Sequence, residues 1–195
     1  MEDNRSALRR QALARRASLP PDRCLEWSRP IQDRAVQLPE YLSAAAVALY
    51  SPVQNEVDTT AIRDQALRDG KKVFYPKLDR EDGPAFARVL SGGDLRPGRF
   101  GVPEPIGQNL LTPHDCSGLV VFVPGVLFDR WGHRLGRGGG WYDRVLDRLN
   151  RRGVFVGLAY EFQIVERVPT ENWDQRVHFI LTEDRIIDCG EGRGA

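Results

Sequence analysis

One continuous segment, from Val120 to Leu149, constrains the fold more than any other part of the sequence. It predicts a buried strand at Leu119 to Val123, because Pro124 and Gly125 end a short apolar, β-branched run there. A helix is predicted from near Trp141, since the apolar residues that follow recur on one helical face. A strand, a loop and a helix in this order favour an α/β fold.

The loop between this strand and helix has the composition of a phosphate-binding site. It contains four glycines and two flanking arginines, namely Gly136, Gly138, Gly139, Gly140, Arg134 and Arg137. Glycine lets the backbone approach a ligand and adopt positive φ, so that consecutive N–H groups face an anion. The helix N-terminus adds its dipole, and arginine adds forked donors. The spacing matches neither a Walker A loop nor a GxGxxG fingerprint, and a flexible surface turn with solvated arginines is the alternative.

The whole pattern, PGVLFDxxGxRLGRGGGWYDRxL, closely resembles the signature of the 5-formyltetrahydrofolate cyclo-ligase family, also called 5,10-methenyltetrahydrofolate synthetases. Trp141 stands where that family usually has tyrosine. Two further segments resemble the family in the same order along the chain. They are YSPVQNEVDTTAI, from Tyr50 to Ile62, and GRFGVPEP, from Gly98 to Pro105, to which we assign no chemistry. The resemblance spans essentially the whole chain.

The resemblance implies an ATP site that begins in the first predicted helix, Arg5 to Arg16. In the family, two cations four residues apart in this helix meet the ATP phosphates, and Arg5 and Arg9 occupy their positions. Without the resemblance, the helix reads as a basic solvated face. The remaining ATP-binding residues that it implies are Arg134, Leu135, Gly136, Arg137, Gly138, Gly139, Gly140, Trp141 and Tyr142.

The resemblance also implies folate contacts at Glu56, Arg137 and Tyr142. Glu56 lies between a predicted strand, Val47 to Tyr50, and a predicted helix, Thr59 to Arg68. Open α/β sheets collect ligands at such strand ends, although an acidic residue before a helix is also favoured by the helix dipole. Arg137 is the predicted catalytic residue, because it would stabilise charge on the phosphoryl group in transfer.

Asp143 is the predicted Mg²⁺ ligand, although a first-turn aspartate is also stabilised by the helix dipole. The stretch PTENWDQRVHFILTE, from Pro169 to Glu183, departs from the family near its end. Trp173 replaces a histidine, and His178 replaces an aspartate assigned to the ion in some members. Neutral histidine suits Mg²⁺ poorly. Either ATP, water and Asp143 hold the ion, or His178 is simply a strand residue, or the site is impaired; we favour the first two.

The activity implied by the resemblance is ATP- and Mg²⁺-dependent cyclisation of 5-formyltetrahydrofolate to 5,10-methenyltetrahydrofolate, with ADP and phosphate as co-products. The alternative is a non-catalytic folate- or nucleotide-binding relative that is damaged at His178. The retained Asp143 and the intact loop argue against that alternative. A sugar-phosphate isomerase or transferase of the same architecture would not need Arg5, Arg9 and Glu56 together.

Alternating strands and helices define the predicted architecture. The N-terminal part is helical, with Pro30 kinking or breaking the second helix. Further strands are predicted at Lys72 to Tyr75, Phe86 to Leu90, Val154 to Tyr160 and Val177 to Leu181. We therefore expect a three-layer α/β/α sandwich with a largely parallel, doubly wound sheet and N-terminal helices, in a single domain over residues 1–195.

Composition excludes several other classes of protein. Lys and Arg number 28 against 27 Asp and Glu, so no basic field points to nucleic acid. Cys24, Cys116 and Cys189 are odd in number and lack CxxC spacing, which disfavours a disulfide framework or zinc site and suits a reducing cytoplasm. No apolar run reaches the ~20 residues of a membrane helix, and no secretory signal is evident. We expect a cytoplasmic monomer with a small-molecule substrate.

Overall fold

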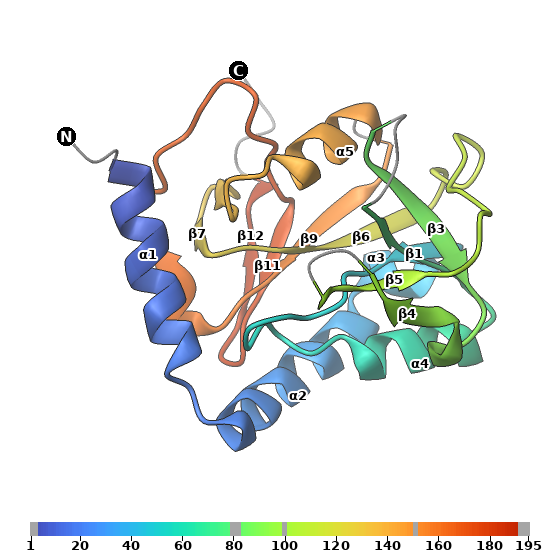
Figure 1. Ribbon diagram of the computed structural model, residues 1–195, viewed down its shortest axis with the longest axis horizontal. Helices are drawn as coiled ribbons and strands as arrows, with labels where there is room; N and C mark the ends of the chain where they lie inside the picture. The colour runs from blue at the N-terminus through green and yellow to red at the C-terminus, as the bar shows by residue number, and fades with distance from the viewer. Residues whose placement is uncertain (1–3, 79–82, 99–100, 150–151, 191–195) are drawn as a thin grey trace.

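The computed structural model describes residues 4–78, 83–98, 101–149 and 152–190, and Figure 1 shows helices packed around a central sheet. The helices are α1 (Asn4–Ala17), α2 (Pro21–Gln37), α3 (Pro39–Ser43), α4 (Thr60–Arg68) and α5 (Trp141–Leu149). The strands are β1 (Ala46–Ala48), β2 (Lys72–Lys77), β3 (Ala85–Val89), β4 (Leu95–Pro97), β5 (Pro103–Pro105), β6 (Leu119–Pro124), β7 (Leu127–Asp129), β8 (Arg134–Leu135), β9 (Val154–Leu158), β10 (Ile164–Val165), β11 (Phe179–Leu181) and β12 (Ile186–Asp188). Within the described residues, no helix is both long and apolar enough to span a membrane.

The central sheet is doubly wound. Its strands lie in the order β12-β11-β9-β6-β1-β2-β3. The inner strands run parallel to one another, and the edge strands β3 and β12 are antiparallel to their neighbours. The chain begins in the middle with β1, adds β2 and β3 on one side, and returns through β6 to build the other side. The strand order therefore reverses between β1 and β6, which is where such sheets bind ligands beyond their carboxyl ends.

Both faces of this sheet are covered, as the apolar strands of a parallel sheet require. On one face, α2, α3 and α4 share a core cluster with Val120 and Phe122 of β6. On the other face, Val145 and Leu146 of α5 pack in a second cluster with Val121. Successive residues of β6 thus alternate between the two clusters, with the period of a strand. The predicted α/β/α sandwich with a largely parallel, doubly wound sheet is confirmed.

A second, smaller sheet carries the first helix. Its strands lie in the order β10-β7-β8, and Ala12 of α1 packs in a buried cluster with Val126, Leu127 and Leu135. Because the glycine loop follows Leu135 directly, this cluster holds α1 and the loop together at one side of the molecule (Figure 1). The sheet was not predicted, since strands of two or three residues give no readable period.

The predicted disruption of the second helix at Pro30 does not end the helix. Helix α2 continues through this residue, from Pro21 to Gln37. Proline removes one N–H donor, and the carbonyl deprived of it belongs to Glu26, four residues earlier. Glu26 is exposed, so water can satisfy that carbonyl. Of the two outcomes predicted at Pro30, the break is wrong for this reason, and a kink stays a prediction.

The first strand is shorter than the predicted Val47 to Tyr50, since β1 ends at Ala48. Two hydrogen bonds draw Tyr50 into the loop that follows. Its hydroxyl donates to the carbonyl of Val57 at 2.8 Å, and the hydroxyl of Thr59 donates to the Tyr50 carbonyl at 2.9 Å. The chain therefore leaves the sheet early and carries the following loop over the strand end.

Gly132, in the turn between β7 and β8, is a position at which we expect no larger residue to fit without loss of stability. Its φ is +82°, and a Cβ at this position would overlap the carbonyl oxygen of Val177. We expect Gly132→Ala to lower the free energy of unfolding by about 3 kcal/mol, from backbone strain and displacement of that segment. Urea unfolding measures the change. Gly139→Ala is the control, because its methyl group meets open space; equal stability of the two variants would contradict the prediction.

Candidate active site

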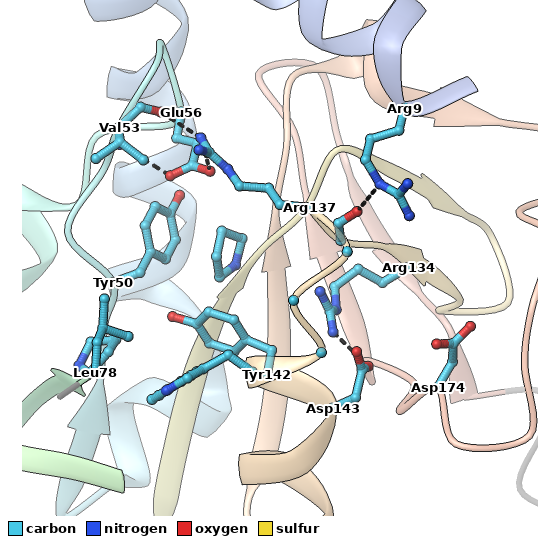
Figure 2. A pocket seen from close by; sticks show the side chains of 18 of the residues that line it. Arg9, Tyr50, Val53, Glu56, Leu78, Arg134, Arg137, Tyr142, Asp143 and Asp174 are labelled. Atoms are coloured by element: carbon cyan, nitrogen blue, oxygen red, sulfur yellow. Dashed lines mark hydrogen bonds and ion pairs between the residues drawn. The ribbon is translucent and has the colours of Figure 1, made fainter. Parts of the chain in front are cut away.

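A pocket of about 410 Å³ lies at the switch point between β1 and β6 (Figure 2). Tyr50 and Ser51 line it beyond β1, and Pro124 and Gly125 line it at the end of β6. All but one of the predicted site residues also line it: Arg5, Arg9, Glu56, Arg134, Gly136, Arg137, Gly138, Gly139, Gly140, Trp141, Tyr142 and Asp143. The exception is Leu135, which packs in the apolar cluster beneath α1.

The glycine loop keeps backbone donors available on the pocket wall. Gly138 and Gly140 have positive φ, at 101° and 61°. Arg9 donates from Nε to the carbonyl of Gly136 at 2.8 Å, and Arg144 donates to the carbonyl of Gly139 at 2.9 Å. Within the described part of the chain, no hydrogen bond takes up the N–H groups of residues 138–140. The loop is therefore held by its carbonyls, which leaves these N–H groups for an anion.

Arg134 and Asp143 form an ion pair where the loop meets α5. The Nη2 atom of Arg134 lies 2.7 Å from Oδ1 of Asp143, and the Gln175 N–H donates to the same oxygen at 3.2 Å. Arg134 is buried, and its Nε has no hydrogen-bond partner among the described residues. A buried donor without a partner costs free energy. This end of the pocket is thus poised for a further acceptor.

Arg5, from α1, is held by the C-terminal segment. Its Nη1 and Nη2 atoms contact the two carboxylate oxygens of Asp174 at 2.8 and 3.3 Å, and Glu171 lies 3.8 Å away. The bidentate geometry fixes both groups. Asp174 also accepts the N–H of Glu171 at 2.8 Å. Arg5 therefore reaches the pocket as predicted, already paired with a carboxylate.

Glu56 receives two arginines at the opposite wall. Its Oε1 lies 3.1 Å from Nη2 of Arg137 and 3.4 Å from Nη2 of Arg16, while Oε2 accepts the Val53 N–H at 3.1 Å. Figure 2 shows Arg137 reaching from the glycine loop to Glu56. The structure thus brings the predicted catalytic arginine and the predicted folate contact into direct contact.

Aromatic side chains form the apolar part of the pocket. The ring centroids of Trp141 and Tyr142 lie 4.9 Å apart in an edge-on arrangement, and Pro76 and Leu78 also line the pocket. The indole N–H of Trp141 and the hydroxyl of Tyr142 are buried, with no hydrogen-bond partner among the described residues. Burial raises the pKa of Tyr142 well above its usual value, so the hydroxyl stays protonated as a donor. Both residues line the pocket, so a polar ligand that reached these donors would satisfy them.

The two departures near the C-terminus have different surroundings. His178 accepts the Phe155 N–H on Nδ1 at 2.9 Å and does not line the pocket. His178 directly precedes β11, which begins at Phe179 rather than at the predicted Val177, and its hydrogen bonds tie it to the edge of the sheet rather than to the pocket. Trp173, in contrast, lies at the pocket rim with 66% of its surface exposed.

The cysteines are free, and none of them lines the pocket. Cys116 is buried, and Cys24 and Cys189 are half-buried. Burial raises the pKa of Cys116, and it raises that of Cys189 to about 12. Their surroundings are those of inert thiols rather than of nucleophiles.

Two features of the pocket and its supporting residues were not predicted from the sequence. Arg16 is fully buried and reaches Glu56 from the end of α1; its position among the arginines of a basic helix gave no sign of this. The segment GRFGVPEP contributes Val102 to the lining, and Glu104 in it accepts the Leu78 N–H at 2.8 Å. The prolines of this segment, which indicate a rigid connection, were the only feature of its sequence that pointed to a structural role.

Comparisons with known proteins identify the family of this chain. The model of the 5-formyltetrahydrofolate cyclo-ligase family matches residues 1–183. The cyclo-ligase of Haemophilus influenzae is 36% identical over 156 residues, 77% of this chain and 82% of the relative. The cyclo-ligase of Escherichia coli K12 is 31% identical over 179 residues, which cover 88% of this chain and 96% of the relative. The NMR structure of Aquifex aeolicus 5,10-methenyltetrahydrofolate synthetase superimposes with a TM-score of 0.84 and 36% identity, covering 98% of this chain and 95% of that one. The chain therefore belongs to the 5-formyltetrahydrofolate cyclo-ligase family.

Proposed function

We propose that this protein catalyses the ATP- and Mg²⁺-dependent cyclisation of 5-formyltetrahydrofolate to 5,10-methenyltetrahydrofolate, with release of ADP and phosphate. The observation that carries the proposal is the position of Arg137, which arises from the glycine loop and ends on Glu56. These residues represent the two predicted subsites, a phosphate cradle and a folate contact. The reacting atoms of both substrates would therefore meet beside this pair.

The proposed reaction has two steps. The formyl oxygen attacks the γ-phosphorus of ATP, and ADP leaves, which turns a poor leaving group into a phosphate ester. The N10 amine then attacks the formyl carbon and loses its proton, the carbon–oxygen bond breaks, and phosphate leaves with that oxygen. Phosphoryl transfer asks the protein mainly for positioning and charge neutralisation. No nucleophilic side chain is required.

The proposed phosphate contacts lie at the cationic end of the pocket. Arg5, Arg9 and Arg134 would bind ATP oxygens there, together with the free N–H groups of residues 138–140. Arginine presents a planar fork of donors that matches phosphate geometry. Trp141 and Tyr142 would line the wall next to these contacts, with the Tyr142 hydroxyl as a donor to substrate.

Asp143 is the proposed protein ligand of Mg²⁺. Its Oδ1 is engaged by Arg134 and Gln175, so Oδ2 is the atom available. In the described ranges, no three His, Cys, Asp or Glu side chains cluster as a metal site. Magnesium bound with a nucleotide needs only one or two protein carboxylates, because phosphate oxygens and water complete its shell. The residues therefore fit the ion, which when bound would neutralise charge on the β- and γ-phosphates.

The proposed enzyme acts as a monomer with one domain over residues 1–195, in the cytoplasm. A complete site within one chain supports the monomer, since the pocket draws on residues from Arg5 in α1 to Asp174. The free cysteines suit a reducing compartment. We propose no membrane or nucleic-acid partner.

The proposed activity is tested by following methenyltetrahydrofolate absorbance with the purified full chain. Folinic acid, ATP and Mg²⁺ are supplied together, and then each is omitted in turn. We expect product with all three present and none when any one is left out, because phosphoryl transfer must precede ring closure. Magnesium-free reactions contain a chelator, so that trace metal cannot support turnover.

Other results would point to other functions. Absence of product, while calorimetry shows that folinate and ATP still bind, would identify a binding-only relative. Absence of binding by either ligand would overturn the folate assignment altogether. Product that forms without ATP would contradict the proposed phosphorylated intermediate.

A further inference from the structure

Arg16 lies behind the pocket wall, where it contacts the lining residues Gly125 and Glu56 without lining the pocket itself. Its side chain is 2% exposed and donates to the carbonyls of Gly125 and Gln54, each at 3.1 Å, and to Oε1 of Glu56 at 3.4 Å. These contacts link the segments that follow β6 and β1. Asn55 fastens the same loop, since its side-chain amide donates to the Arg16 carbonyl at 3.1 Å. A ligand cannot displace Arg16 without opening this packing.

Arg137 contacts the same carboxylate in a different way. Its side chain is 39% exposed, and its Nη2 lies 3.1 Å from Oε1 of Glu56 and 3.3 Å from the Val53 carbonyl. Because the guanidinium is open to solvent, water can take over its donors when it leaves the carboxylate. The backbone of Arg137 belongs to the glycine loop, where the proposed phosphates bind. The Arg137 guanidinium can therefore bind either the Glu56 carboxylate or a phosphate of ATP.

If Arg137 moves from Glu56 to a phosphate, hydrogen-bond acceptor positions on Glu56 become free. A carboxylate has about four acceptor positions, and Glu56 uses three, for Arg16, Arg137 and the Val53 N–H. Departure of Arg137 frees one position on Oε1 beside the open position on Oε2. The Glu56 side chain is only 8% exposed, so its charge still needs a counter-ion. Arg16 supplies that counter-ion.

We propose that Arg16 is a positioning residue that fixes the Glu56 side chain and neutralises its charge. Arg137 can then leave the Glu56 carboxylate for the phosphates of ATP. Its departure opens Glu56 to a substrate with paired N–H donors. The inference rests on the proposed function. It requires that ATP and folinate favour each other's binding, because either ligand separates Arg137 from Glu56. Such coupling is reciprocal.

The experiment is calorimetric titration of folinate into the full chain, with and without a non-hydrolysable ATP analogue and Mg²⁺. We expect the analogue to tighten folinate binding to the wild type about tenfold. Arg137→Gln should remove this coupling and bind folinate alone at least as tightly as the wild type. Arg130→Gln is the control, because this exposed arginine lies in the turn after β7 and does not line the pocket.

Variants of Arg16 test the positioning role. Arg16→Gln should weaken folinate binding about tenfold, and it should also weaken binding of the analogue, because Arg137 is then held on Glu56 as its counter-ion. Arg16→Lys should restore part of the loss by keeping the charge. The control is Arg15→Gln, on the same helix, where the guanidinium lies 4.5 Å from the Phe162 ring. Thermal unfolding checks that each variant is folded.

The possible outcomes distinguish failure of this inference from failure of the proposed function. Independent binding of both ligands to the wild type, or coupling that survives in Arg137→Gln, would overturn the inference alone. Folinate affinity in folded Arg16→Gln equal to the wild-type value would do the same. A wild type that does not bind folinate would overturn the proposed function and the inference together. The Arg137→Gln test stands even if Arg16→Gln does not fold, because Arg137 is an exposed loop residue.

Discussion

Arg137→Ala is expected to lower kcat for methenyltetrahydrofolate formation about 10²–10³-fold, the usual loss when one donor to a transition state is removed. The dissociation constant for folinate should rise by less than about threefold, or fall. The reason is that Arg137 occupies an acceptor position on Glu56 in the free protein, and its removal frees that position for the substrate. A loss confined to kcat identifies an interaction made mainly in the transition state. Steady-state kinetics and folinate calorimetry measure the two quantities.

The control for this prediction is Arg130→Ala. Arg130 is an exposed cation in the turn after β7, and it does not line the pocket. Removing it tests whether general loss of positive charge slows the reaction. Turnover that is unchanged in Arg137→Ala, or lowered equally in both variants, would remove the transition-state role from Arg137.

The sequence predicted the location of the site because its motifs lie at the ends of elements. Strand β6 is buried on both faces and ends at Pro124, so the glycine loop must emerge at the carboxyl edge of the sheet. Strand β1 is its parallel neighbour, so the segment with Glu56 emerges beside it. The strand order, which was not predicted, accounts for the proximity of Arg137 and Glu56. Both residues were predicted as site residues through the family resemblance.

The partners of the charged residues could not be predicted in the same way. Arg5 and Asp174 are 169 residues apart in sequence, and Arg16 and Glu56 are 40 apart. Such pairs depend on how α1 docks against the sheet, and this docking runs through β7, β8 and β10, strands too short to give a pattern. An arginine in a basic helix also has the same local sequence whether it is solvated or buried, so Arg16 was indistinguishable from Arg15.

Glu56→Ala is expected to raise the dissociation constant for folinate about 10–100-fold and to leave ATP affinity unchanged or tighter. Charge-assisted hydrogen bonds are worth about 1.5–3 kcal/mol each, which corresponds to this range. ATP binding should not weaken, because Glu56 holds Arg137 away from the phosphates in the free protein. Calorimetry with each ligand separately measures both affinities.

The same substitution should destabilise the protein, and a second variant separates that effect from binding. Without Glu56, Arg16 is a charge with 2% exposure and no carboxylate partner, for which the expected cost is about 3–5 kcal/mol. Glu56→Gln keeps an acceptor for the Val53 N–H and the shape of the side chain, so it should lose less stability. It should still lose folinate affinity, because the negative charge that attracts the substrate's N–H donors is gone. Glu171→Ala, which removes an exposed carboxylate at the opposite wall, controls for general charge effects. Folinate affinity that stays at the wild-type value in folded Glu56→Gln would therefore place the folate contact elsewhere in the pocket.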